Sequence, residues 1–151
     1  MKQRLLWALL AVLLGPVAAQ ADNAEAIAVI VNKDNPVGAL YIGDLARIYR
    51  GERGEWPDDQ KIVTTNHDIE SDLRRRFYGS VLSAPPTEKF HLPGSLIPFH
   101  TITFKSSRVI VKYVANTPQA IGYVSVDHLD SSVKVLRING LLPADTSYPV
   151  K

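Results

Sequence analysis

The stretch "EAIAVIVNKDNPVG", residues 25–38, contains an unbroken apolar run from Ala26 to Val31 that is rich in β-branched side chains. The run stops at a cluster of Asn, Lys, Asp and Pro, which are residue types that end strands and begin turns. A run of this kind is typical of a strand buried on both faces, as in a parallel sheet covered by helices. The stretch therefore predicts the buried centre of an α/β sheet.

Helices and strands alternate after this strand. The sequence "IGDLARIYRG", residues 42–51, has apolar side chains at helical spacing and ends on glycine, which predicts a short helix. A second strand is predicted over Lys61–Thr65, and the sequence "ESDLRRRFYGSVL" predicts a helix over residues 70–82. Residues 83–98 are rich in proline and are expected to be irregular.

The C-terminal half repeats this alternation. After a short extended piece, Ser106 or Ser107 is expected to cap a helix. The side chains that this helix should turn inward are Val109, Ile110, Tyr113 and Val114. The sequence "QAIGYVSV", residues 119–126, predicts a strand, and "SSVKVLRING", residues 131–140, predicts a half-buried edge strand that ends in an Asn-Gly turn. The pattern as a whole predicts a small three-layer α/β domain.

The N-terminus has the features of a cleaved secretory signal peptide. Lys2 and Arg4 precede an apolar run, Leu5–Leu14, and a triplet of small and polar residues ends at Ala21. A membrane anchor is the alternative, but a spanning helix needs about 20 apolar residues, roughly twice the length of this run. We expect residues 1–21 to be a signal peptide cleaved after Ala21, and residues 22–151 to form one domain in the periplasm.

Charge and cysteine content exclude several classes of protein. Removal of the signal peptide would reduce the 17 basic residues to 15, which equals the number of acidic residues. A chain that is nearly neutral lacks the broad positive surface by which proteins bind nucleic acid or anionic lipid. The chain contains no cysteine, so its core must be stable without disulfides or thiolate-bound metal.

Three segments resemble the substrate-binding components of phosphate ABC transporters, the PstS-like type II periplasmic binding proteins. These segments are "IAVIVNKDNPVGAL", "DLARIYRGERGEWPDDQKI" and "ANTPQAIGYVSVDHLDSSVKVLRING". Two short motifs carry the resemblance, Ile48-Tyr49-Arg50-Gly51 with a following Trp56, and Thr117–Val124. Full-length members of this family have two lobes with phosphate between them. The resemblance, which runs from about Ile27 to Pro149, implies a single lobe of this fold, with a mostly parallel sheet flanked by helices.

The resemblance also implies a place for the ligand. In the family, phosphate in this lobe is held by an Arg, a Ser four residues later, and then Gly and Thr, at a turn between a strand and a helix. By position these residues fall on His67, Ser71, Asp72 and Leu73, with Arg74 next. Free N–H groups and the dipole at a helix N-terminus favour an anion. Only the serine is retained, and the acidic residues here are also those that simply cap a helix.

The function expected from the sequence is that of an exported, non-catalytic, solute-binding protein for phosphate or another small oxyanion. The alternative is a protein-interaction or accessory module that keeps the fold, has lost ligand binding, and contacts a partner or a second copy through the surface facing the cleft. We expect no enzyme, because the sequence has no Gly-x-Ser-x-Gly motif, cysteine nucleophile or glycine-rich phosphate loop.

The remaining polar and aromatic residues suggest no further site. No cofactor or metal is expected, because no two of the four histidines have the spacing of helical metal ligands. Ser106 and Ser107 are interpreted as a helix cap whose hydroxyls could also line the rim of an oxyanion site. Tyr78 and Tyr123 are interpreted as aromatic side chains at the edge of the core, without a specific role.

Overall fold

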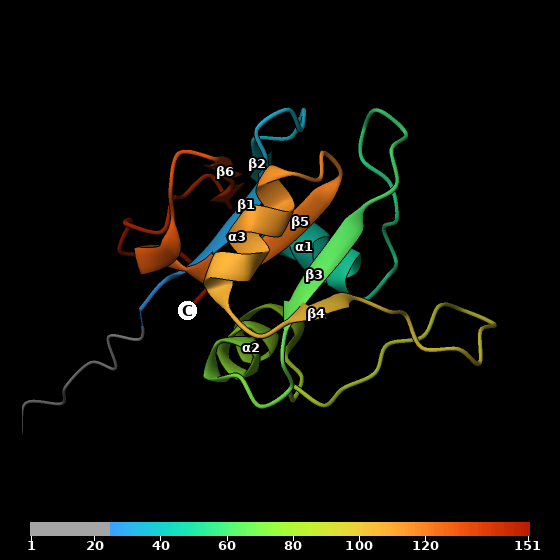
Figure 1. The fold of residues 1–151 in the computed structure, drawn as a ribbon. Helices are drawn as coiled ribbons and strands as arrows, with labels where there is room; N and C mark the ends of the chain where they lie inside the picture. The colour runs from blue at the N-terminus through green and yellow to red at the C-terminus, as the bar shows by residue number, and fades with distance from the viewer. Residues whose placement is uncertain (1–24) are drawn as a thin grey trace, which may run out of the picture.

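The computed structural model describes residues 25–151, so the predicted signal peptide lies outside the described residues (Figure 1). The elements in chain order are β1 (Ile27–Asn32), β2 (Ala39–Leu40), α1 (Ile42–Tyr49), β3 (Val63–His67), α2 (Asp72–Phe77), η1 (Tyr78–Leu82), β4 (Ile102–Phe104), α3 (Ser107–Ala115), β5 (Ala120–Ser125), η2 (Val126–His128), β6 (Val133–Val135) and β7 (Arg137–Ile138). Within this part of the chain, no helix has the length and apolar character needed to cross a membrane.

The central sheet has five strands in the order β4-β3-β5-β1-β6. β3 is parallel to both of its neighbours, β4 and β5. β1 is antiparallel to both β5 and β6, so it alone runs against the other four strands. The prediction of a mostly parallel sheet flanked by helices is therefore confirmed. The short strands β2 and β7 form a separate parallel pair.

β1 is buried on both faces, as its apolar run predicts. Ile27, Val29 and Val31 face a core that also contains buried residues of α1, α2 and η1. Ala28 and Ile30 face a second core formed with α3. The three layers are visible in Figure 1, where α3 lies on one side of the sheet and α1 on the other. The sequence pattern correctly predicts that β1 is buried. It does not predict that β1 is antiparallel to its neighbours, because burial depends on what covers a strand and not on the direction of the strand.

The helices agree with the sequence in number but differ in detail. α1 ends as predicted, with Gly51 in the left-handed region at a φ of 77°. The second helix is shorter than predicted, because α2 stops at Phe77 and the chain continues as the wider π-helical turn η1. β3 begins two residues later than predicted, at Val63, and it continues to His67 because it pairs with β4 along its last three residues.

α3 buries a different face from the one predicted. Ser106 caps the helix by accepting a hydrogen bond from the N–H of Val109. Ile110 and Val114 are buried as expected, but Val109 is 46% exposed and Val111 is buried instead. The prediction for Val109 was wrong because one helical step turns a side chain by about 100°. The buried stripe centres on Ile110 and Val114, and of their two neighbours only Val111 lies on the covered side.

Gly122 in β5 is closely packed against α3 and the neighbouring strand β3. A Cβ at this position would lie 2.6 Å from Cγ2 of Ile110 and 2.7 Å from the hydroxyl of Thr65. We expect Gly122→Ala to lower the free energy of unfolding by about 1–3 kcal/mol, because overpacking forces a well-packed core to shift. Denaturant unfolding measures the change. Gly79→Ala is the matched control, since a Cβ there meets nothing within 4 Å. An equal loss in both variants would contradict the packing argument.

Candidate functional site

The ends of three parallel strands bring two helix starts together. The chain leaves β3 through the turn Asp68–Ser71 into α2, and it leaves β4 through Ser106 into α3. The N–H of Asp68 donates to the carbonyl of Phe104 at 3.1 Å, which ties the two strand ends. We call the region formed by residues 68–73, 106–107 and 125 the carboxyl edge. Open α/β sheets bind ligands outside the carboxyl ends of their strands, so this edge is the candidate site.

Ser71 is the N-cap of α2. Its backbone is extended, and its hydroxyl oxygen accepts a hydrogen bond from the N–H of Arg74 at 3.4 Å. The N–H groups of Asp72 and Leu73 belong to the first helical turn and have no hydrogen-bond partner within residues 25–151. The side chain of Leu73 packs against the core and offers no donor of its own. The turn therefore presents two backbone donors and one hydroxyl.

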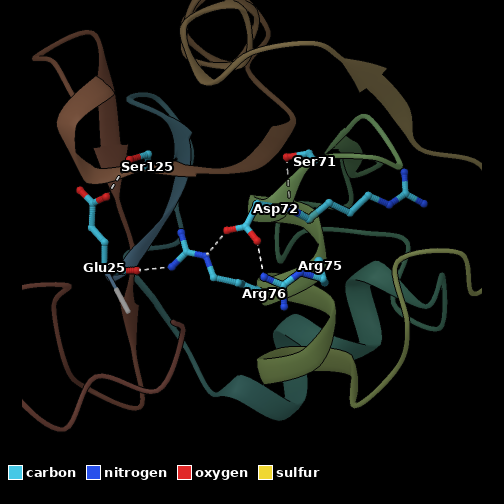
Figure 2. Close-up of polar contacts among 7 residues, drawn as sticks. Glu25, Ser71, Asp72, Arg75, Arg76 and Ser125 are labelled. Carbon is cyan, nitrogen blue, oxygen red and sulfur yellow. Dashed lines mark hydrogen bonds and ion pairs between the residues drawn. The ribbon is translucent and has the colours of Figure 1, made fainter. Parts of the chain in front are cut away.

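A carboxylate already occupies the start of this helix. Asp72 contacts Arg75 through Oδ1, and its Oδ2 lies 3.2 Å from Nε of Arg76 (Figure 2). Arg76 in turn donates to the carbonyl of Glu25 at 2.8 Å, which ties α2 to the segment preceding β1. The hydrogen bond from Arg75 lowers the pKa of Asp72 below its ordinary value. Asp72 is therefore ionised at neutral pH, and two guanidinium groups offset its charge.

His67 faces inward rather than toward solvent. Its side chain is 3% exposed, and Nε2 lies 2.9 Å from the carbonyl oxygen of Tyr123, to which it donates. Burial lowers the pKa of His67 below its ordinary value of 6.5. The imidazole is therefore neutral at pH 7 and its Nε2–H is already used. At the position where the resemblance implies an arginine, the structure has an uncharged ring that braces β3 against β5.

Arg74 lies behind the turn and holds it in place. Nε donates to the carbonyl of Pro86 at 2.9 Å, and Nη1 donates to the carbonyl of His67 at 3.0 Å. The guanidinium also stacks over the ring of Tyr78, 4.8 Å from its centroid. Of the five residues predicted for the site, the structure therefore brings Ser71, Asp72 and Leu73 together at the carboxyl edge. It links Arg74 to the carbonyl of His67 beneath that edge.

A buried polar network centred on Asn66 was not predicted from the sequence. This side chain is fully buried, and its Oδ1 accepts hydrogen bonds from the N–H of His67, at 3.0 Å, and from the hydroxyl of Tyr123. Its Nδ2 donates to the hydroxyls of Tyr78, at 2.8 Å, and Thr101, at 3.2 Å. Both tyrosines thus have the specific role that was not predicted. The available signal was the polar run Thr64–His67 inside a strand, since buried polar residues need partners.

The buried hydroxyl of Ser107 stabilises the start of α3. Ser107 accepts a hydrogen bond from the N–H of Ser125 at 3.3 Å, which fixes the end of β5 against the start of α3. In the part of the chain that the structure describes, no three His, Cys, Asp or Glu side chains are placed to hold a metal ion. The chemistry available at the carboxyl edge is hydrogen-bond donation to an anion.

Comparisons with known proteins identify relatives in sequence and in fold. The chain is 32% identical over 134 residues to the phosphate-binding protein PstS of Bacillus subtilis (strain 168), a match that covers 82% of this chain and 41% of the relative. A putative phosphate ABC transporter substrate-binding protein with bound phosphate from Clostridium perfringens is 26% identical, with a TM-score of 0.68 over 83% of this chain and 51% of that chain. No protein-family model matches the sequence.

A third match has the same fold. The structure of an ABC-type phosphate transport receptor from Vibrio cholerae gives a TM-score of 0.68 at 23% identity, over 83% of this chain and 53% of that chain. The chain thus spans about half the length of the relatives that it matches.

Burial of His67 predicts a dependence of stability on pH. Because the folded state lowers its pKa, the unfolded chain takes up a proton first as the pH falls through about 6.5, which favours unfolding. We expect the wild type to lose more unfolding free energy between about pH 7.5 and about pH 5.5 than His67→Gln, which keeps an N–H donor but does not titrate. His100→Gln, at an exposed position, should behave like the wild type. An undiminished loss in His67→Gln would contradict the assignment.

Proposed function

Because this chain is a partial, about half-length member of the phosphate ABC transporter substrate-binding protein family, we propose that its carboxyl edge binds phosphate or another small oxyanion without chemical conversion. The observation that carries this proposal is the start of α2, where the N–H groups of Asp72 and Leu73 directly follow the capping hydroxyl of Ser71. Backbone donors at a helix start, together with a hydroxyl, suit a tetrahedral oxyanion. The protein would act in the periplasm after export.

The roles of the five residues follow from their contacts. Ser71 supplies a hydroxyl, and Asp72 and Leu73 supply backbone N–H groups. Arg74 and His67 act from beneath the turn, since Arg74 holds the carbonyl at the end of β3 and adds positive charge close to the ligand. His67 keeps the end of β3 against β5 through its bond to Tyr123.

The carboxyl edge forms one side of a site, and this limits its affinity. An anion on an open surface stays largely solvated, and charges separated by water attract only weakly. The carboxylate of Asp72 also repels an anion, although Arg75 and Arg76 offset much of its charge. We therefore expect weak binding by the chain alone, and tighter binding where a second surface covers the ligand and excludes water.

Isothermal titration with phosphate at low salt tests the proposal. We expect Asp72→Asn to bind about 3- to 10-fold more tightly than the wild type, because removal of one charge at about 5 Å changes the interaction by roughly 1 kcal/mol near water. Ser71→Ala should weaken binding. Glu55→Gln makes the same change in net charge at an exposed position before β3 begins, far from the turn, and should have no effect. The proposal fails if neither the wild type nor Asp72→Asn gives saturable heat at millimolar phosphate.

A second candidate function, assembly through the same edge, is favoured by exposed apolar side chains. Ile69 in the turn is 41% exposed, and Val109 in the first turn of α3 is 46% exposed. An apolar groove of about 490 Å³, lined in part by Ala26, Val126 and Leu129, lies near the end of β5. Another copy or a protein partner could cover these apolar side chains.

Light scattering after gel filtration tests assembly. We expect a wild-type dimer that Ile69→Lys converts to a monomer, since a buried lysine without a partner charge is costly in an interface. Leu96→Lys is the matched control, because Leu96 is 97% exposed on the segment between η1 and β4, away from this edge. A wild type that stays monomeric, or a dimer that only Leu96→Lys disrupts, would contradict assembly through the carboxyl edge.

A further inference from the structure

A polar cavity lies on the flank of the fold, apart from the carboxyl edge. It has a volume of about 220 Å³ and is bounded by η1, the segment 88–101 and Thr103 in β4. Its lining includes the cationic side chains of Arg74 and Lys89, the polar residues His100, Tyr78 and Thr101, and the rings of Phe90 and Phe99. We call this cavity the flank pocket. It opens beside the start of β4, whereas the carboxyl edge lies beyond the other end of that strand.

The buried amide of Asn66 fixes two of these hydroxyls. The N–H of His67 donates to Oδ1 of Asn66 at 3.0 Å, so the amide cannot be turned over without placing two donors face to face. Both protons on Nδ2 are therefore directed at Tyr78 and Thr101. Asn66 is fully buried and makes four hydrogen bonds in this orientation, which uses all of its capacity.

The orientation of the Asn66 amide determines whether the hydroxyls of Tyr78 and Thr101 act as hydrogen-bond donors. A hydroxyl has one proton to donate, and where its oxygen already accepts from an N–H, that proton must point elsewhere. Within residues 25–151, neither the Tyr78 nor the Thr101 hydroxyl donates to a protein acceptor. Both residues line the flank pocket. The wall of the pocket therefore contains two hydroxyls that are held in place by one buried amide and lack a protein acceptor among the described residues.

Arg74 adds a fixed positive charge to the same wall. Its guanidinium is held by the carbonyls of Pro86 and His67, which use two of its five N–H groups. Among the described residues no carboxylate forms an ion pair with it. Lys89 and His100 lie at the exposed rim, and Glu88 is the one acidic residue of the lining. Donors and positive charge thus dominate a pocket whose other walls are aromatic.

We propose that the flank pocket binds a small organic monocarboxylate that carries an apolar or aromatic group. The carboxylate accepts hydrogen bonds from Tyr78, Thr101 and Arg74, since an ionised carboxylate has only acceptors to offer. The apolar group lies against Phe90 and Phe99. This ligand class differs from an inorganic oxyanion because the rings of Phe90 and Phe99 form part of the lining, and the pocket is separate from the donors at the start of α2.

Titration of the purified protein with benzoate tests this proposal. We expect saturable binding that Thr101→Val weakens about tenfold or more, because the variant keeps the shape of the side chain and loses one hydrogen bond to a charged group. Tyr78→Phe should give a similar loss. Benzyl alcohol, which has the ring without the charge, should bind more weakly than benzoate by at least the same factor. Circular dichroism confirms that each variant is folded.

Ser71→Ala separates this pocket from the proposed phosphate site. It should leave benzoate binding unchanged, while Thr101→Val should leave phosphate binding unchanged, so the failure of one proposal does not affect the other. The proposal is overturned if benzoate gives no saturable signal, if folded Thr101→Val binds benzoate as the wild type does, or if benzyl alcohol binds equally well. Displacement of benzoate by equimolar inorganic phosphate would overturn the organic ligand class.

Discussion

Burial of both faces of β1 requires a helical layer on each side of the sheet, because Ile27–Val31 are completely shielded from solvent. α3 supplies one layer, and α1 with α2 and η1 supplies the other. To build both layers from parallel strands, the chain must leave β3 and β4 at the same edge and return across the sheet. The two helix starts at the carboxyl edge are therefore a consequence of covering β1, and the candidate anion site depends on that coverage.

The sequence contained more information about burial than about pairing. The periodicity of α1, the capping serines and the doubly buried strand could all be predicted, because each depends on residues close together in the chain. The reversed direction of β1 could not, since Ile30 pairs with Gly122 and nothing local encodes that partner. The π-helical turn after α2 was also not predicted, because the apolar residues Phe77 and Val81 are four residues apart, which is the spacing of an ordinary helix.

At the candidate site, too, the local features could be predicted from the sequence and the long-range contacts could not. Ser71 could be identified as a cap from the acidic and hydroxyl residues around it, and the structure confirms this role. Asn66 could not be assigned a role, because its partners Tyr78, Thr101 and Tyr123 come from η1, from the residue before β4 and from β5. Asn66 and its buried partners thus hold the turn between β3 and α2 in place more than the exposed residues of the turn do. Arg74 and the backbone of His67 lie between the carboxyl edge and the flank pocket and form part of the support of both.

The hydrogen bonds that hold the proline-rich segment bear on the conformational entropy that the chain loses on folding. Arg74 holds Pro86, Arg50 donates to the carbonyl of Leu82, and the N–H of Phe99 donates to the carbonyl of Phe90 at 2.7 Å. The Arg50 bond anchors the last residue of η1, and the other two bonds hold the connection between η1 and β4. Hydrogen bonds of the folded state leave the unfolded chain as free as before, so they offset the entropy lost when this connection is ordered and do not reduce that loss. The prolines do reduce it, because they restrict the unfolded chain. A stretch without regular structure can in this way form a persistent wall.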